Sequence, residues 1–129
     1  MRYKVQQFSL YLQRNTKTKG IMNIENAKSQ MRKGMLEYCV LLLLKQQPFY
    51  ASDIIQRLKK AQLLVVEGTL YPLLTRLKND GLLNYEWQES TQGPPRKYYS
   101  ISDSGREFLD GLDTAWLELN QTVTYLKTI

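Results

Sequence analysis

Residues 67 to 87, EGTLYPLLTRLKNDGLLNYEW, restrict the possible folds more than any other part of the chain. Four leucines at helical spacing fall within about 100° of a helical wheel, which predicts a single buried stripe. They are Leu70, Leu73, Leu74 and Leu77. Asn-Asp-Gly at 79–81 then stops the helix, because Gly81 can adopt the left-handed conformation that ends many helices. The residues that follow alternate as a strand does, so we predict a short helix that passes directly into a strand.

Pro72 lies inside this helical pattern and bears on where the helix begins. A proline is accepted without strain in the first turn of a helix, where the backbone N–H groups have no partner within the helix. We therefore expect the helix to begin near Thr69, or else to bend at Pro72.

Two further helices are predicted before this window. The first covers residues 24–45 and is ended by Pro48. The second follows in YASDIIQRLKK, with Ala51 or Ser52 near its N-cap and Ile54, Ile55 and Leu58 facing inward. The apolar face of the first helix is expected to comprise Met31, Met35, Cys39 and Leu42, with Leu36, Val40 and Leu43 beside it.

A β-hairpin is predicted over residues 83–101, where LLNYEWQ and RKYYSI are separated by the turn STQGPP. Tyr98 and Tyr99 should point to opposite faces of the hairpin, and Trp87 is interpreted as a structural residue. Three short helices followed by a hairpin are typical of a winged helix-turn-helix. The expected fold class is therefore mainly α with a small β-hairpin, followed by a long C-terminal helix.

The C-terminal helix is predicted to start at Ser102 or Ser104, since Ser104 and Glu107 have the spacing of a capping box. Its apolar residues recur at alternating spacings of three and four, which is the pattern of a coiled-coil seam. They are Leu109, Leu112, Trp116, Leu119, Val123 and Leu126. Either the first helices of the same chain or a second copy of the chain would cover this seam.

Composition excludes several functions. The chain has no histidine and one cysteine, so histidine-dependent nucleophiles and histidine-containing zinc sites are absent, and no glycine-rich phosphate loop occurs. We expect no enzyme activity, no metal and no cofactor. No apolar run approaches the roughly 18 residues of a membrane span, and no secretory signal is present, which predicts a cytoplasmic protein without membrane contact.

The net charge of +6 is unevenly distributed. Residues 1–21 hold five of the 18 basic residues and none of the 12 acidic ones, which leaves +1 for residues 22–129. Residues 1–21 are interpreted as a basic leader that is either flexible or non-native. Residues 22–101 are expected to form the winged helix-turn-helix domain, and residues 102–129 a dimerisation helix.

The segments GTLYPLLTRLKNDGLL and GPPRKYYSISDSGREFL resemble the PadR family of bacterial transcriptional regulators, and MRKGMLEYCVLLLL and YASDIIQRL are similar to its first two helices. The single helix after the wing resembles the small subclass of that family. The resemblance implies a twofold homodimer in which the C-terminal helix and the N-terminal helix pack across the axis. It also implies that a planar aromatic effector could stack on Trp116 between the subunits.

We therefore expect a sequence-specific transcriptional regulator, a repressor that binds double-stranded DNA at an inverted repeat. A winged-helix module that binds another protein and a MarR-like regulator are the alternative interpretations. The predicted dimer residues are the six of the seam, and Trp116 is also the predicted effector contact. The predicted DNA-binding residues are Tyr50, Ser52, Thr69, Tyr71, Thr75, Arg76, Asn79, Arg96 and Lys97.

Overall fold

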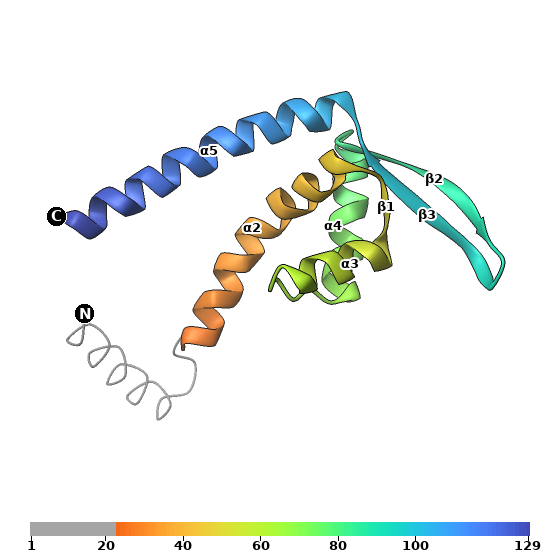
Figure 1. Cartoon of the computed structure of the whole chain (residues 1–129), viewed down its shortest axis with the longest axis horizontal. Helices are drawn as coiled ribbons and strands as arrows, with labels where there is room; N and C mark the ends of the chain where they lie inside the picture. The colour runs from red at the N-terminus through yellow and green to blue at the C-terminus, as the bar shows by residue number, and fades with distance from the viewer. Residues whose placement is uncertain (1–22) are drawn as a thin grey trace. The chain divides into compact units, whose positions relative to one another are not determined.

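The structure, a computed structural model, describes residues 23–129, so the predicted leader of residues 1–21 lies outside the described residues. The chain divides into two compact units, residues 1–36 and 37–129. Helix α2 begins in the first unit and ends in the second, which contains the other described elements. In chain order the elements are α2 (Ile24–Gln46), β1 (Phe49–Tyr50), α3 (Ala51–Lys60), α4 (Glu67–Asn79), β2 (Leu83–Ser90), β3 (Gly93–Ile101) and α5 (Asp103–Thr128) (Figure 1).

These elements form a winged helix-turn-helix, as the sequence predicts. Strands β2 and β3 make the predicted hairpin, with Trp87 opposite Lys97 and Gln88 opposite Arg96. The sheet has a third strand that was not predicted, because β1 is only two residues long. It pairs antiparallel with β3, so the strand order is β1-β3-β2.

Gly93, Pro94 and Pro95 belong to β3, and their assignment to the turn was therefore wrong. Proline lacks a backbone donor and is confined to strand edges or irregular positions. Both prolines satisfy this rule. Strand β1 pairs only with residues 98–99, which leaves that side of β3 open further along, and the β2–β3 register shifts between Gln88 and Ser90.

The core of the second unit lies where α3, α4 and the sheet meet. Residues from each element are at most 7% exposed, including Ile54 and Leu58 of α3 and Tyr99 of β3. Tyr98 is half-buried, so the two tyrosines do point to opposite faces. Three of the four predicted leucines of α4 are fully buried, and Leu73 is half-buried.

The predicted apolar face of α2 was wrong in part. Met31 is 73% exposed, and Met35, Cys39 and Leu42 are half-buried. The buried residues are Leu36, Val40, Leu41 and Leu44. Because almost every position from Met35 to Leu44 is apolar, the period of the sequence permits several faces, and tertiary contacts select one of them.

Helices α3 and α4 end in the same hydrogen-bonding arrangement, the Schellman motif. After α4, Gly81 N–H donates to the Lys78 carbonyl at 3.0 Å and Leu82 N–H to the Leu77 carbonyl at 2.9 Å. Gly81 has the positive φ, +79°, that the motif requires and the sequence predicts. After α3 the corresponding residue is Gln62, with φ of +65°. A side chain in this conformation is uncommon, and the sequence carries no signal for it.

The start of α4 differs from the prediction. The helix begins at Glu67, so Pro72 is its sixth residue and lies beyond the first turn. The carbonyl of Gly68, which would accept a bond from residue 72, is on the exposed side of the helix, where water can satisfy it. The N-cap of α3 also differs: it is Tyr50, without a side-chain bond, and not Ala51 or Ser52.

Helix α5 starts from Ser102, one of the two predicted caps. Ser102 Oγ accepts from Gly105 N–H at 3.0 Å and donates to the Gly81 carbonyl at 2.6 Å. Gly105 is buried against the turn after α4, since a Cβ there would lie 2.1 Å from the carbonyl oxygen of Leu82. The end of α4 and the beginning of α5 are thus joined in one compact turn.

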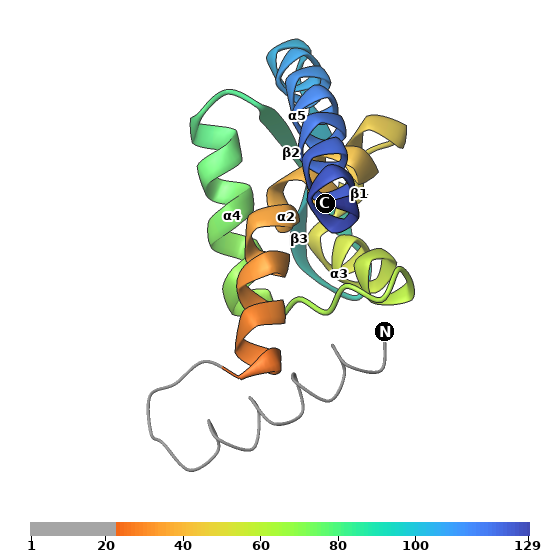
Figure 2. The same ribbon diagram turned by 90° about the vertical axis from the view of Figure 1, so that its left-hand side faces the viewer.

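One side-chain hydrogen bond joins α5 to the C-terminal part of α2. Tyr38 Oη donates to Asp113 Oδ1 at 2.6 Å, and this bond, together with burial, raises the pKa of Tyr38 to about 12. Beyond Asp113 only Ala115 is half-buried, and every residue from Trp116 to Ile129 is exposed. Figure 2, in which the C-terminal end of α5 faces the viewer, shows this segment continuing as one uninterrupted helix.

Candidate nucleic-acid interface

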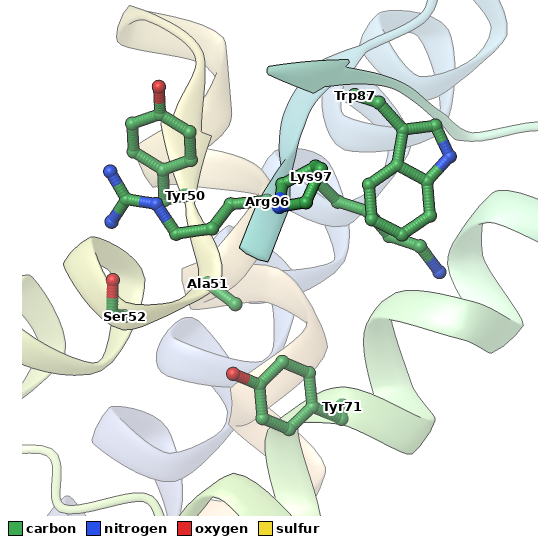
Figure 3. A pocket seen from close by; sticks show the side chains of 8 residues that line it. Tyr50, Ala51, Ser52, Tyr71, Trp87, Arg96 and Lys97 are labelled. Atoms are coloured by element: carbon green, nitrogen blue, oxygen red, sulfur yellow. The ribbon is translucent and has the colours of Figure 1, made fainter. Parts of the chain in front are cut away.

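A cavity of about 330 Å³ opens between the start of α3, helix α4 and the hairpin (Figure 3). It brings together five of the nine predicted DNA-binding residues, which are separated by up to 47 positions in the sequence. The lining residues are Tyr50, Ala51, Ser52, Tyr71, Trp87, Pro95, Arg96 and Lys97.

Each wall of the cavity follows from local structure. The pairing of Tyr50 with Tyr98 holds the end of β1 against β3, and α3 starts at the next residue. Because Tyr50 caps α3 without a side-chain bond, the first N–H groups of α3 are free to meet an anion. Tyr71, in α4, adds a hydroxyl to that of Ser52, whereas the Tyr50 hydroxyl is directed away from these two (Figure 3).

The two cations of the cavity rest on aromatic rings. The Arg96 guanidinium lies 4.0 Å from the centre of the Tyr50 ring. Tyr50 Oη in turn donates a hydrogen bond to Gln88 Oε1, on the residue opposite Arg96 in the sheet. Lys97 Nζ lies 4.6 Å from the Tyr85 ring centre and 5.4 Å from that of Trp87. A cation on a ring keeps its N–H donors available for a second partner.

The electrostatics of the cavity favour an anion. Within the described chain, neither Arg96 nor Lys97 forms a salt bridge, and no acidic residue is among those that line the cavity. Two hydroxyl groups, of Ser52 and Tyr71, line the cavity together with the two cations and the start of α3, and donors of these kinds bind phosphate oxygens. The arrangement can hold a phosphate of a nucleic-acid backbone.

Trp87, interpreted as a structural residue, has an indole that is 62% exposed and lines the cavity, which the sequence did not predict. It also lines a second, open hollow further along the hairpin with Glu89, Pro94 and Pro95. The alternation of the strand sequence places Trp87 and Tyr85 on one face, but it does not show that α4 leaves the outer part of that face uncovered.

The other four predicted DNA-binding residues are exposed on α4 and lie outside the cavity. Thr69, Thr75 and Asn79 have no side-chain hydrogen bond among those recorded for residues 23–129. Arg76 differs, because its Nη2 lies 3.5 Å from Glu37 Oε2 on α2. The predicted residues therefore form two groups, a cavity group and a group along α4.

The residues of the predicted dimer seam also fall into two groups, one buried and one exposed. Leu109 is fully buried within its own chain and Leu112 is half-buried, so Leu109 is core and is not free to meet a partner. The remaining seam residues are between 45% and 59% exposed. They are Trp116, Leu119, Val123 and Leu126. An exposed apolar stripe of this length is typical of an interaction surface.

The fold and the cationic cavity beside α4 define a winged-helix DNA-binding protein. Comparison with known proteins gives the family. Residues 40–111 match the model of the transcriptional regulator PadR-like family. The chain therefore belongs to the PadR-like transcriptional regulators, as the resemblance predicted. None of the helices in residues 23–129 is long and apolar enough to span a membrane.

Solved structures of PadR-like regulators are similar over most of the chain. A PadR-like transcription factor from Bacteroides fragilis is 69% identical, with a TM-score of 0.68 over 78% of this chain and 98% of the other. A regulator from Bacillus cereus is 38% identical, with a TM-score of 0.67 over 75% and 95% of the two chains. A regulator from Eggerthella lenta is 32% identical, with a TM-score of 0.71 over 80% and 90%.

Proposed function

We propose that the protein is a cytoplasmic, homodimeric repressor that binds an inverted repeat in double-stranded DNA. The cavity lined by Arg96, Lys97 and the hydroxyls of Ser52 and Tyr71 carries this proposal, because it lies beside the exposed face of α4. With α4 in the major groove, the cavity would receive a backbone phosphate and the hairpin would follow the adjacent backbone.

Within this arrangement the two groups of residues have different tasks. The cavity residues bind backbone and set affinity without reading sequence. Thr75 and Asn79 lie on the exposed face of α4 and reach base edges, with Thr69 and Arg76 at its margin. The indole of Trp87 packs against the sugars beside the phosphate that Lys97 contacts.

The double variant Arg96→Ala/Lys97→Ala tests the cavity. It should weaken binding to all DNA sequences and flatten the dependence of log affinity on log salt by about one to two units, because each phosphate contact contributes about 0.9. Sequences selected from random DNA by the unmodified protein supply the operator, and fluorescence anisotropy supplies the affinities.

Arg106→Ala/Lys127→Ala is the matched control, since it removes two cations from α5 and none from the cavity. An unchanged salt slope in the Arg96/Lys97 variant would overturn the assignment of the cavity. By contrast, Thr75→Ala or Asn79→Ala should change which operator sequence is preferred and leave the slope close to its original value.

The exposed apolar half of α5 supports the dimer. Four large residues in a seam pattern remain about half exposed in the single chain, and a second copy of α5 is the surface that matches their spacing. A twofold dimer would present two α4 helices about 34 Å apart, one turn of DNA. Light scattering of the full chain at micromolar concentration should report a dimer, and a folded monomer would remove both the dimer and the inverted repeat.

We further propose that a planar aromatic compound binds at Trp116 between the subunits and releases DNA. Trp116 is 45% exposed and central in the seam, so two indoles would face each other across the axis. Stacking adds about 0.5–1.5 kcal/mol beyond burial, which implies affinity of roughly micromolar order. The compound can shift the equilibrium between two dimer geometries only by as much as its affinities for the two geometries differ.

Tryptophan fluorescence tests the effector site, because the chain has two tryptophans. Titration of planar aromatic compounds should quench the Trp87→Phe variant, in which Trp116 is the reporter. The same compounds should leave Trp116→Phe unaffected. Quenching that survives in Trp116→Phe would place the compound elsewhere.

A further inference from the structure

Four cations surround the proposed DNA-binding face, and each has a partner within the protein. Three of them lie over aromatic rings: Arg96 over Tyr50, Lys97 over Tyr85 and Trp87, and Lys78 over Tyr85. The fourth, Arg76, lies against a carboxylate, with Nη2 3.5 Å from Glu37 Oε2. Within residues 23–129 this is the only salt bridge that joins two different elements.

The two kinds of partner have opposite consequences for a DNA phosphate. A ring contacts the face of a cation and leaves its N–H donors free, so ring and phosphate can be bound together. A carboxylate accepts the same N–H donors that a phosphate would accept, so the two acceptors compete.

Arg76 is placed where this competition matters. On a helical wheel it is next to Asn79 and Pro72, three residues after and four before, and both are exposed. Its side chain is 59% exposed, whereas that of Glu37 is only 32% exposed. The arginine therefore has room to turn away from α2, and the carboxylate stays with α2. Partly exposed ion pairs are weak enough to exchange on binding.

We infer that Glu37 is an internal competitor that holds Arg76 back from DNA and thereby limits the affinity of the protein for its operator. On binding, Arg76 leaves Glu37 and donates to an acceptor oxygen of the DNA, and Glu37 returns to water. The inference depends on the proposed DNA-binding function and adds to it a residue on α2, outside the helix-turn-helix surface.

The test is a double-mutant cycle in the full chain, measured by fluorescence anisotropy on the selected operator at several salt concentrations. Glu37→Gln removes the competing charge at nearly constant shape. It should raise affinity about two- to five-fold, the range expected from releasing an exposed ion pair. The salt slope should stay close to its original value, because Arg76 contacts the DNA in the bound state of both proteins. In the Arg76→Gln background, Glu37→Gln should leave affinity unchanged.

A second variant separates pairing from charge. Glu37→Asp keeps the negative charge but withdraws the carboxylate by one methylene, so it should give part of the gain in affinity. It also keeps the inference testable should Glu37→Gln fold poorly, which circular dichroism would reveal.

Three results would overturn the inference. An equal gain from Glu37→Gln in both backgrounds would mean general charge repulsion, and a loss of affinity would mean that Glu37 positions Arg76 for DNA. No change in any of the variants would mean that the pair serves only the fold. Failure of the unmodified protein to bind any DNA would instead refute the proposed function, and that result is distinct from these three.

Discussion

Helices α4 and α5 carry apolar stripes of similar regularity, but the two stripes are buried to different extents. In α4, the residues Leu70, Leu74 and Leu77 are all fully buried within the chain. In α5, Leu109 is fully buried, whereas Leu119 is 59% exposed although it continues the same seam. The two helices have different neighbours: α4 packs on α3 and β2, whereas every residue of α5 from Trp116 onward is exposed.

The comparison shows that one sequence rule serves two purposes. Apolar residues at helical spacing indicate that a face must be covered, but not by which molecule. In α4 the face stabilises the fold, since each fully buried leucine contributes about 1.5–3 kcal/mol. In the second half of α5 the same kind of face is exposed, and the proposed dimer would cover it. Mutations should therefore affect the two helices in different measurements.

The same substitution in each stripe gives the largest expected contrast. Leu74→Glu would bury an unpaired carboxylate in the core of the chain and should cost several kcal/mol, a large part of a typical domain stability. Leu119→Glu should leave the winged helix folded and abolish the dimer, because the charge enters only the interface. Circular dichroism and analytical ultracentrifugation measure the two effects. A Leu119→Glu protein that loses its helix content would contradict the division between the stripes.

Substitutions of two glycines in α5 test how far along the helix the packed core extends. Gly105→Ala places a Cβ 2.1 Å from the Leu82 carbonyl oxygen and 2.7 Å from Ile101 Cγ1, and the turn after α4 must move. It should destabilise the protein by about 1–3 kcal/mol or more. Gly111→Ala meets nothing within 4 Å and should stabilise by about 0.5–1 kcal/mol. Chemical denaturation of both variants checks the signs, and destabilisation by Gly111→Ala would show that this position is also packed.

Tyr38→Phe probes the side-chain hydrogen bond that joins α5 to the C-terminal part of α2. Loss of the bond to Asp113 should cost about 1–2 kcal/mol near neutral pH. The pKa of Tyr38 is about 12 in the folded protein against an ordinary value of 10. This stabilisation is therefore fully present below pH 10 and is lost as pH rises toward 12, where the unfolded chain ionises first.

Tyr38→Phe should consequently show a weaker fall in stability between pH 10 and 12. Part of the fall should remain, because burial also raises the pKa of Tyr99. Tyr125→Phe, on the exposed half of α5, is the matched control and should behave as the unmodified protein. An identical alkaline profile for Tyr38→Phe and the unmodified chain would remove the role assigned to the bond.

The candidate site was only partly predictable. The residue types at 50, 52, 71, 96 and 97 pointed to phosphate contacts, but nothing in the sequence showed that these five and not Thr69 or Arg76 would line one cavity. That grouping depends on the pairing of β1 with β3, a strand too short to give any periodic signal. The exposure of Trp87 was not predicted for a related reason, since alternation identifies a strand face without showing how far α4 covers it.

The sequence by itself determined where several helices and strands of this protein begin and end. The stop after α4 at Gly81 and a serine cap for α5, at Ser102 or Ser104, follow from interactions among residues a few positions apart. The alternation of apolar residues indicated the extent of the hairpin. Tertiary structure decided which side of α2 is buried, why two prolines fit in β3, and where the α5 seam leaves the core. Each of these depends on which element lies opposite, and burial is a property of two surfaces, of which a local sequence specifies only one.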